Sequence, residues 1–285
     1  MKRSRAVTAA LWIAAFAVTV LLAVFQRMTG PSHPLRGTAV PVNGQSISYK
    51  LPRSNEGRET LSIVVPGPSA DARATLEWRR FPTAEVFRRQ PMTADADGEL
   101  ETRIPRQPAA GKVEYRILLE VAGETISIPG SETVVARYRG DVPAWVLVPH
   151  ILIMFSSMLV STRALFEVLR PGAPRARVLV LVSMGLLVVG GLVLGPIVQR
   201  FAFGAFWTGW PLGHDLTDNK TLIAFLAWLP ATALAWRQAR TRIAVALGWV
   251  VMMGVFLIPH SARGSQLDWS TVDGAGEDTE SEMRE

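Results

Sequence analysis

The stretch FAFGAFWTGWPLGHDLTDNKT, residues 201–221, is polar, rich in Trp and Gly, and lies between two apolar blocks. It contains His214, Asp215, Asp218 and Lys220, the densest set of chemically able side chains in a chain otherwise rich in aliphatic residues and Arg. Its repeated Gly and Pro residues prevent a continuous helix, and irregular backbone is tolerated at a membrane only where protein or water satisfies it. We therefore expect an interfacial or re-entrant loop packed on a helical bundle.

Apolar residues are concentrated in five blocks, and none of these blocks has a charge near its middle. The blocks cover residues 6–25, 144–169, 178–198, 221–236 and 243–259. A run of about 20 apolar residues can cross a bilayer as a helix. The sequence therefore predicts an integral membrane α-helical protein with five spans and the lipid bilayer as a partner.

Short basic clusters lie beside alternate ends of these blocks. They are Lys2, Arg3 and Arg5; Arg170, Arg175 and Arg177; and Arg237, Arg240 and Arg242. By the positive-inside rule these ends are cytoplasmic, so residues 27–142, the 201–220 stretch and the acidic C-terminal tail lie outside. Because the basic residues form no single patch with interleaved aromatics, the net charge of +6 does not indicate a nucleic-acid partner.

The chain is divided by these patterns into five regions. The first apolar run is longer than the usual 7–15 residue core of a signal peptide, so it predicts a retained anchor. The expected regions are an anchor (1–26), a Pro/Gly linker (27–36), an extracytoplasmic β-domain (37–141), a four-helix membrane domain (142–261) and an acidic, disordered tail (262–285). The sequence has no Cys, which excludes disulfides and thiolate metal sites and fits a bacterial inner-membrane protein with a periplasmic domain.

Between the anchor and the second block, short alternating segments are separated by Pro, Gly, Asn and Asp. Candidate strands are 45–51, 60–65, 74–81, 85–90, 99–104, 112–121, 124–128 and 133–138. Turns at Asp97-Gly98, Ala110-Gly111 and Ala122-Gly123 are expected to supply the positive φ of tight reversals. Strands at this spacing predict an all-β sandwich.

The segment from Ala74 to Val121 resembles an immunoglobulin or fibronectin type III-like module. Trp78, the strand end at Ile104-Pro105 and Tyr115 carry the resemblance. It implies a module that binds or spaces, without catalytic residues.

Two arginine pairs in this module, at 79–80 and 88–89, leave two interpretations open. They are either a surface for an acidic partner or lipid headgroups, or an ordinary solvated strand face.

Three histidines fall at the outer end of the predicted bundle: His150 in the second helix, His214 in the loop and His260 after the fifth helix. With Asp215 they are a suitable ligand set for a transition metal ion such as Zn, Cu or Fe. Two of the histidines are also suitable axial ligands of a b-type haem. The spacing matches neither HExxH nor CxxCH.

A reading without a cofactor stays open for the same residues. Thr217 or Asp218 then caps the fourth helix, and His150 bonds to a neighbouring carbonyl. Lys220 is not explained by this reading and is expected at the rim of the His/Asp site. Catalysis without a metal would need Ser261 or Ser265 as nucleophile, and no GxSxG elbow is present. Whether the protein is an enzyme is left open.

The membrane part is similar to a bacterial inner-membrane protein family of unknown function. The similarity is carried by VPHILIMF (148–155), FWTGWPLGHDLTDNKT (206–221) and IPHS (258–261). Two functions are expected from these patterns: a periplasm-facing His/Asp site that binds a metal or haem, or a non-catalytic envelope scaffold or accessory subunit. In the second case the β-sandwich and the outer loop dock a partner protein.

Overall fold

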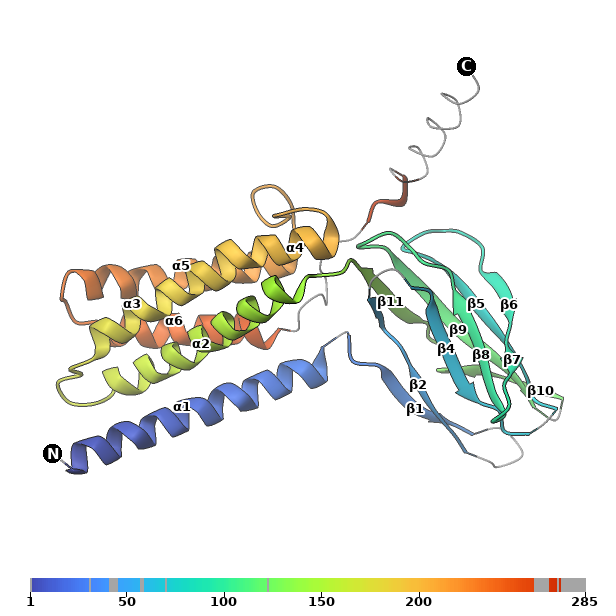
Figure 1. Cartoon of the computed structure of the whole chain (residues 1–285), viewed down its shortest axis with the longest axis horizontal. Coiled ribbons are helices and arrows are strands. Elements are labelled where there is room, and N and C mark those ends of the chain that lie inside the picture. Colours follow the sequence, from blue (N-terminus) through green and yellow to red (C-terminus); the bar gives the residue numbers. More distant parts are fainter. Residues whose placement is uncertain are drawn as a thin grey trace, which may run out of the picture. The chain divides into compact units, whose positions relative to one another are not determined.

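The computed structural model describes residues 2–30, 32–40, 46–56, 59–69, 71–121, 123–258, 267–270 and 272. The chain divides into two compact units. The helical unit combines residues 1–31 and 142–265, and the β unit combines residues 32–141 and 266–285 (Figure 1).

The helical unit contains a helix over each of the five apolar blocks. Its elements are α1 (Lys2–Thr29), α2 (Ala144–Val168), α3 (Ala176–Leu187), η1 (Val188–Leu194), α4 (Gly195–Phe203), α5 (Leu216–Trp236) and α6 (Arg242–Leu257). Here η1 is a π-helical segment that joins α3 and α4 into one run. Within the described residues, three helices are long and apolar enough to cross a membrane: Arg5–Thr29, Ala144–Val168 and Ala176–Phe203. Their length and composition indicate a membrane protein.

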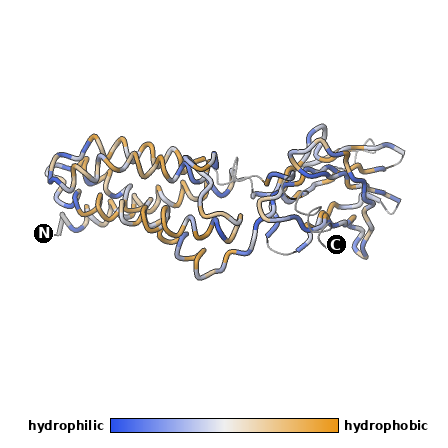
Figure 2. Tube along the Cα trace, turned by 90° about the horizontal axis from the view of Figure 1, so that it is seen from above, coloured by the Kyte–Doolittle hydropathy of each residue, from blue (hydrophilic) through white to orange (hydrophobic). Residues whose placement is uncertain are grey.

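The N-terminus, the α2–α3 connection and the α5–α6 connection lie at one end of the bundle (Figure 1). Figure 2 shows hydrophobic residues along the helices and hydrophilic residues gathered at this end. The basic clusters around Arg175 and Arg240 belong to these two connections. They therefore share one end, as the positive-inside pattern requires.

Small residues let the helices of the bundle approach closely. A Cβ on Gly248 would lie 2.8 Å from the Trp228 ring, and a Cβ on Gly191 would lie 2.7 Å from the Thr221 methyl group. Helix association in apolar surroundings depends on such close packing and on bonds between helices. One such bond runs from the Trp249 indole N–H to Thr162 Oγ1 at 3.0 Å.

The β unit is built from two larger sheets and one hairpin. The six-stranded sheet has the order β3 (Ser54–Glu56), β11 (Val134–Arg139), β9 (Lys112–Val121), β5 (Arg73–Phe81) and β6 (Arg88–Pro91), with β10 (Glu124–Ile128) also beside β9. The three-stranded sheet has the order β4 (Leu61–Pro66), β8 (Glu99–Ile104) and β7 (Thr93–Ala94), and the hairpin pairs β1 (Leu35–Ala39) with β2 (Ile47–Leu51).

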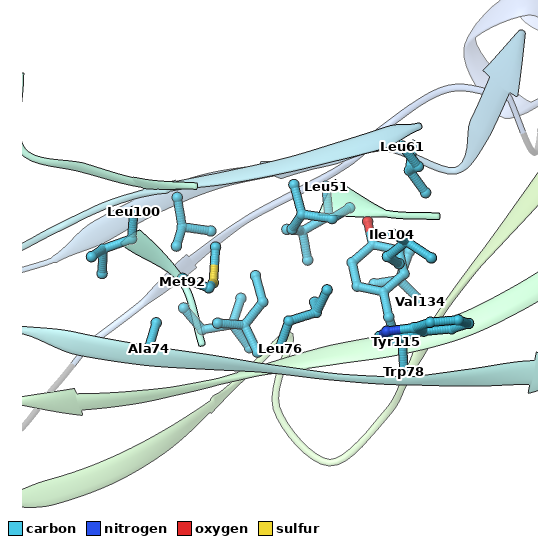
Figure 3. Packing of buried hydrophobic residues seen from close by; sticks show 14 of the residues in the cluster. Leu51, Leu61, Ala74, Leu76, Trp78, Met92, Leu100, Ile104, Tyr115 and Val134 are labelled. Atoms are coloured by element: carbon cyan, nitrogen blue, oxygen red, sulfur yellow. The ribbon is translucent and has the colours of Figure 1, made fainter. Parts of the chain in front are cut away.

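The inner faces of the sheets share one hydrophobic core. Leu100 and Ile104 from one sheet meet Leu76 and Tyr115 from the other, as Figure 3 shows. Trp78, which carries part of the immunoglobulin-like resemblance, is buried in the same core. This is a mixed protein of helices and β-sheets, with the β-sheets in two facing layers.

Several local expectations differ from the structure. The strands β1, β3 and β7 were not predicted, because each is short or lacks apolar alternation. At the Ala110-Gly111 turn the positive φ belongs to Ala110, at 68°, and not to the glycine. Ala110 is held there because its N–H donates to the Tyr138 carbonyl at 3.0 Å.

Part of the tail that was expected to be disordered is folded against the β unit. Trp269 is only 6% exposed. Its indole N–H donates to the Phe81 carbonyl at 3.1 Å, and the Arg80 guanidinium lies 4.9 Å from the centre of its ring. An acidic composition predicts disorder only where no large apolar side chain finds a site, and Trp269 finds one.

Candidate functional site

Asp215 is the N-cap of α5. Its Oδ1 accepts hydrogen bonds from the backbone N–H groups of Thr217 at 2.6 Å and Asp218 at 3.3 Å. The sequence analysis expected Thr217 or Asp218 in this role. The helix begins earlier, at Leu216, because the backbone of Asp215 is still extended with ψ at 123° and its carboxylate reaches the free N–H groups of the first turn. Asp215 is thus engaged in capping, and the expectation of Asp218 as the cap is wrong.

Asp218 organises the loop that precedes α5. Its Oδ2 accepts from the backbone N–H groups of Thr208 at 2.7 Å and Gly209 at 3.0 Å, and from Gln199 Nε2 at 2.9 Å. The Thr208 hydroxyl adds a longer contact of 3.3 Å. The residue is only 5% exposed. Backbone N–H groups of two adjacent loop residues donate to one oxygen of this buried side chain, which holds the loop in a single position.

The approach of the loop to Asp218 requires a glycine. A Cβ on Gly209 would lie 2.5 Å from the Asp218 Cβ. The next residue along α5 extends the same contact, because Asn219 Oδ1 accepts from the Trp210 N–H at 2.7 Å. Successive side chains of the first turn of α5 therefore hold successive backbone groups of the loop.

Lys220 was predicted to lie at the rim of the site. In the structure its side chain is buried instead. It is 2% exposed, and its Nζ donates to the Ile258 carbonyl at 2.6 Å. A lysine that bonds to the last carbonyl groups after a helix stabilises that helix end. Lys220 therefore joins the start of α5 to the end of α6.

The histidines are placed differently from one another. His150 is half-buried, and its Nδ1 lies 2.9 Å from the carbonyl oxygen of Gly190 in η1. Because a carbonyl only accepts, Nδ1 carries the proton. This is the carbonyl-bonded reading that the sequence left open for His150. His214 is exposed, and His260 lies outside the described residues.

The metal-ligand set is not assembled by the residues that the structure describes. Among them, no group of three or more His, Asp or Glu side chains is arranged to hold a metal ion. His150, His214 and Asp215 are all described and do not form such a group. Asp215 and Asp218 instead accept hydrogen bonds from the backbone, and Asp218 also bonds to Gln199, so the loop is held between α4 and α5.

A buried ion pair in α2 was missed by the sequence analysis. Arg163 and Glu167 are both fully buried, and an Arg163 nitrogen donates to Glu167 Oε2 at 2.7 Å. The Arg170 side chain donates to the same oxygen at 3.2 Å, and the Arg163 guanidinium lies 5.7 Å from the Trp12 ring of α1. The available signal was an Arg and a Glu four residues apart inside an apolar block, which places them on one helix face.

The outer face of the six-stranded sheet carries an ordered set of charges, which we call the arginine face. It consists of Arg79, Arg89, Arg116, Glu77 and Glu114. Glu77 lies between two strands, and its two oxygens accept from Arg89 at 2.9 Å and from Arg116 at 2.7 Å. Arg79 Nε donates to Glu114 at 2.5 Å. These partners are opposite one another in the strand register, which holds the guanidiniums at fixed spacing.

The segment before β6 lies over this face. The Phe87 ring is contacted by the Arg79 guanidinium at 4.5 Å and the Arg116 guanidinium at 5.3 Å. Val86, its neighbour, is 87% exposed. Burial would raise the pKa of the Glu77 carboxyl, but the Arg116 and Arg89 guanidiniums hold it below its ordinary value. Glu77 is therefore charged at neutral pH.

A scan against models of protein families found no match, and a search of curated proteins found no similar sequence.

Proposed function

We propose that this chain is a bacterial inner-membrane scaffold whose immunoglobulin-like β unit docks a partner protein on the periplasmic side. Five spans hold the β unit at the membrane, with the N-terminus in the cytoplasm. The arginine face, with the exposed Val86 beside it, is the docking surface, and it is the observation that carries the proposal.

The helices of the last two proposed spans are short. The apolar part of α5, residues 221–236, is about 24 Å long at 1.5 Å per residue, less than the ~30 Å hydrocarbon core, because the start of α5 carries Asp218 and Lys220. With 16 residues, α6 reaches about 24 Å, a mismatch that a bilayer accommodates by local thinning.

The contact of Trp269 with the β unit supports the same topology. Both Arg139, in the last strand before α2, and Trp269, which follows α6 in the chain, belong to the β unit. In the proposed topology the chain between them therefore leaves and returns to the same side of the membrane. The number of crossings in this segment is therefore even. Four crossings, by α2, the α3–α4 run, α5 and α6, satisfy this condition.

The arginine face has the features of a binding surface. Arg is enriched among the residues that dominate binding energies, and an apolar anchor is typically surrounded by polar groups. Side chains that are already fixed lose less entropy when a partner binds. Three arginines against two glutamates leave a net positive charge on this face, which suits carboxylates on the partner around a recess for Val86.

Site-specific photocrosslinking in native membranes tests the proposal. We expect a photoreactive phenylalanine analogue at Val86 in the full chain to give one discrete protein adduct. Arg89→Gln should remove the adduct, because it removes one guanidinium of the proposed docking surface. The Arg89 side chain is 73% exposed, so the substitution alters the surface of the β unit. Arg103→Gln is the matched control, since this arginine is 65% exposed in an ion pair on the other sheet. The absence of an adduct, or an adduct that Arg89→Gln leaves unchanged, would refute the proposed docking surface.

A further inference from the structure

A set of contacts around Trp269 holds the tail segment on the β unit, away from the residues of the arginine face. It is formed by Arg80, Phe81 and the turn at Ala110 and Gly111. The indole N–H donates to the Phe81 carbonyl at 3.1 Å, and the Leu267 N–H contacts the Ala110 carbonyl at 3.4 Å. The ring is therefore held by a directed bond and by a backbone contact two residues earlier.

The fit of the ring is close on two further sides. The Arg80 guanidinium lies 4.9 Å from the ring centre, in the range of a cation–π contact. On the other side, a Cβ on Gly111 would lie only 3.1 Å from Trp269 Cη2. Trp is enriched among the residues that dominate binding energies, and its N–H usually finds a partner when the ring is buried, as it does here.

The segment that carries Trp269 has its own local order. Asp268 Oδ1 accepts from the Ser270 N–H at 3.0 Å and from the Ser270 hydroxyl at 2.7 Å. A cleft of about 420 Å³ adjoins the segment and is lined by Pro82, Thr83 and residues 267–270. Residues 267–270, which contact the β unit, thus form a short turn closed by the Asp268–Ser270 hydrogen bonds.

We infer that this groove is a binding site for a tryptophan-centred acidic segment, and that its resident ligand is residues 267–270 of the same chain. The segment is held by side-chain and backbone contacts: the Trp269 indole on the Phe81 carbonyl, the Arg80 guanidinium on the ring, and the Leu267 N–H on the Ala110 carbonyl. A ligand in the same chain competes as an intramolecular partner, with an effective concentration far above that of a free peptide. Residues 267–270 are therefore an intramolecular ligand of the β unit that another segment of the same chemistry can displace. This role goes beyond the partner docking proposed above.

The test uses a labelled peptide with the sequence of residues 266–272, QLDWSTV, and the membrane protein in detergent or nanodiscs. Fluorescence anisotropy compares the full chain with a chain that stops after residue 265. We expect the shortened chain to bind the peptide at least tenfold more tightly than the full chain. Replacing Trp by Ala in the peptide should weaken binding to the shortened chain at least tenfold.

Two variants of the shortened chain locate the site. Arg80→Gln should weaken peptide binding severalfold, whereas Arg88→Gln should not, although Arg88 also lies over a tryptophan, at 5.0 Å from Trp78. No binding to the shortened chain, equal binding to both chains, or equal binding of the Trp and Ala peptides would overturn the inference. A full chain that is dimeric while the shortened chain is monomeric would assign the groove to the tail of a second copy and overturn the assignment to the same chain.

Discussion

Gln199 in α4 and Asp218 in the first turn of α5 are joined by a hydrogen bond of 2.9 Å, which Nε2 donates to Oδ2. The intervening loop is folded around this bond, since Thr208 and Gly209 donate to the same oxygen. One carboxylate oxygen therefore connects α4, the loop and α5.

Asp218→Ala should lower the free energy of unfolding by about 2–4 kcal/mol, because it leaves buried donors without an acceptor. Asp215→Ala should cost about 1 kcal/mol, the usual loss of an N-cap. Thermal unfolding in detergent measures both. Equal losses in the two variants would contradict the special role assigned to Asp218.

A fragment of residues 32–141 should fold alone. Its core cluster lies wholly within this range, from Ile47 to Tyr138, and takes no residue from the helices. Circular dichroism should show β-structure and a cooperative melt. A disordered spectrum would mean that the fold depends on the tail or on the membrane part.

Glu77 should make this fragment sensitive to acid. Its pKa in the folded state lies below the ordinary value of 4.5, so the stabilisation is complete above pH 4.5 and is lost as pH falls through the folded pKa. Melting temperatures between pH 7 and pH 3 should fall less steeply for Glu77→Gln than for the native fragment. At neutral pH this variant should lose about 1–3 kcal/mol, because it breaks charge-assisted bonds of a side chain that is only 3% exposed.

The matched control for this experiment is Glu101→Gln on β8. Glu101 also binds an arginine, Arg103, but the two side chains are 32% and 65% exposed, and ion pairs at the surface contribute little. The pH profile of this variant should follow the native fragment more closely than that of Glu77→Gln. The reverse order would show that burial between two arginines is not the cause.

Reporter fusions should place both the C-terminus and the β unit in the periplasm. A phosphatase fused after residue 285 should be active, and one fused in the α2–α3 connection, after residue 172, should be inactive. The reason is the basic residues at Arg170 and Arg175, which favour the cytoplasmic side. An inactive C-terminal phosphatase would contradict the five-span topology.

His150→Ala should lower the free energy of unfolding in detergent by about 0.5–1.5 kcal/mol, because it removes the hydrogen bond to the Gly190 carbonyl. His214→Ala should leave stability unchanged, since His214 is exposed. Elemental analysis of the native protein and both variants checks the metal alternative. Loss of near-stoichiometric metal in both variants would restore the metal-site hypothesis.

The alternation of apolar and polar residues predicted the limits of a strand best where one face of that strand packs on the hydrophobic core. The strands 99–104, 112–121 and 124–128 have the predicted limits, because their alternating side chains face the core. The strand β3 could not be found in this way. Its residues Ser54–Glu56 pair in parallel with β11, a partner more than 80 residues away that no local pattern reveals.

The polar loop falls within the predicted stretch 201–220 but is shorter, because α4 extends to Phe203 and α5 begins at Leu216, and the roles of its residues differ from those predicted. Asp215 and Asp218 are three residues apart and both suit a helix cap. Which one caps depends on where the backbone turns into α5, and that is decided by the contacts of Asp218 with Thr208 and Gln199. Lys220 was misplaced for the same reason, since its partner Ile258 lies 38 residues away.

The π-helical segment η1 changes the rotational phase of the helix that contains it. A π-turn accommodates one more residue than an α-turn, and each residue of an α-helix advances by about 100°. Residues after Val188–Leu194 therefore point about 100° away from the direction that an unbroken α-helix would give them. Gln199, five residues after η1, is one of the residues whose direction this offset changes, and from there its side chain bonds to Asp218.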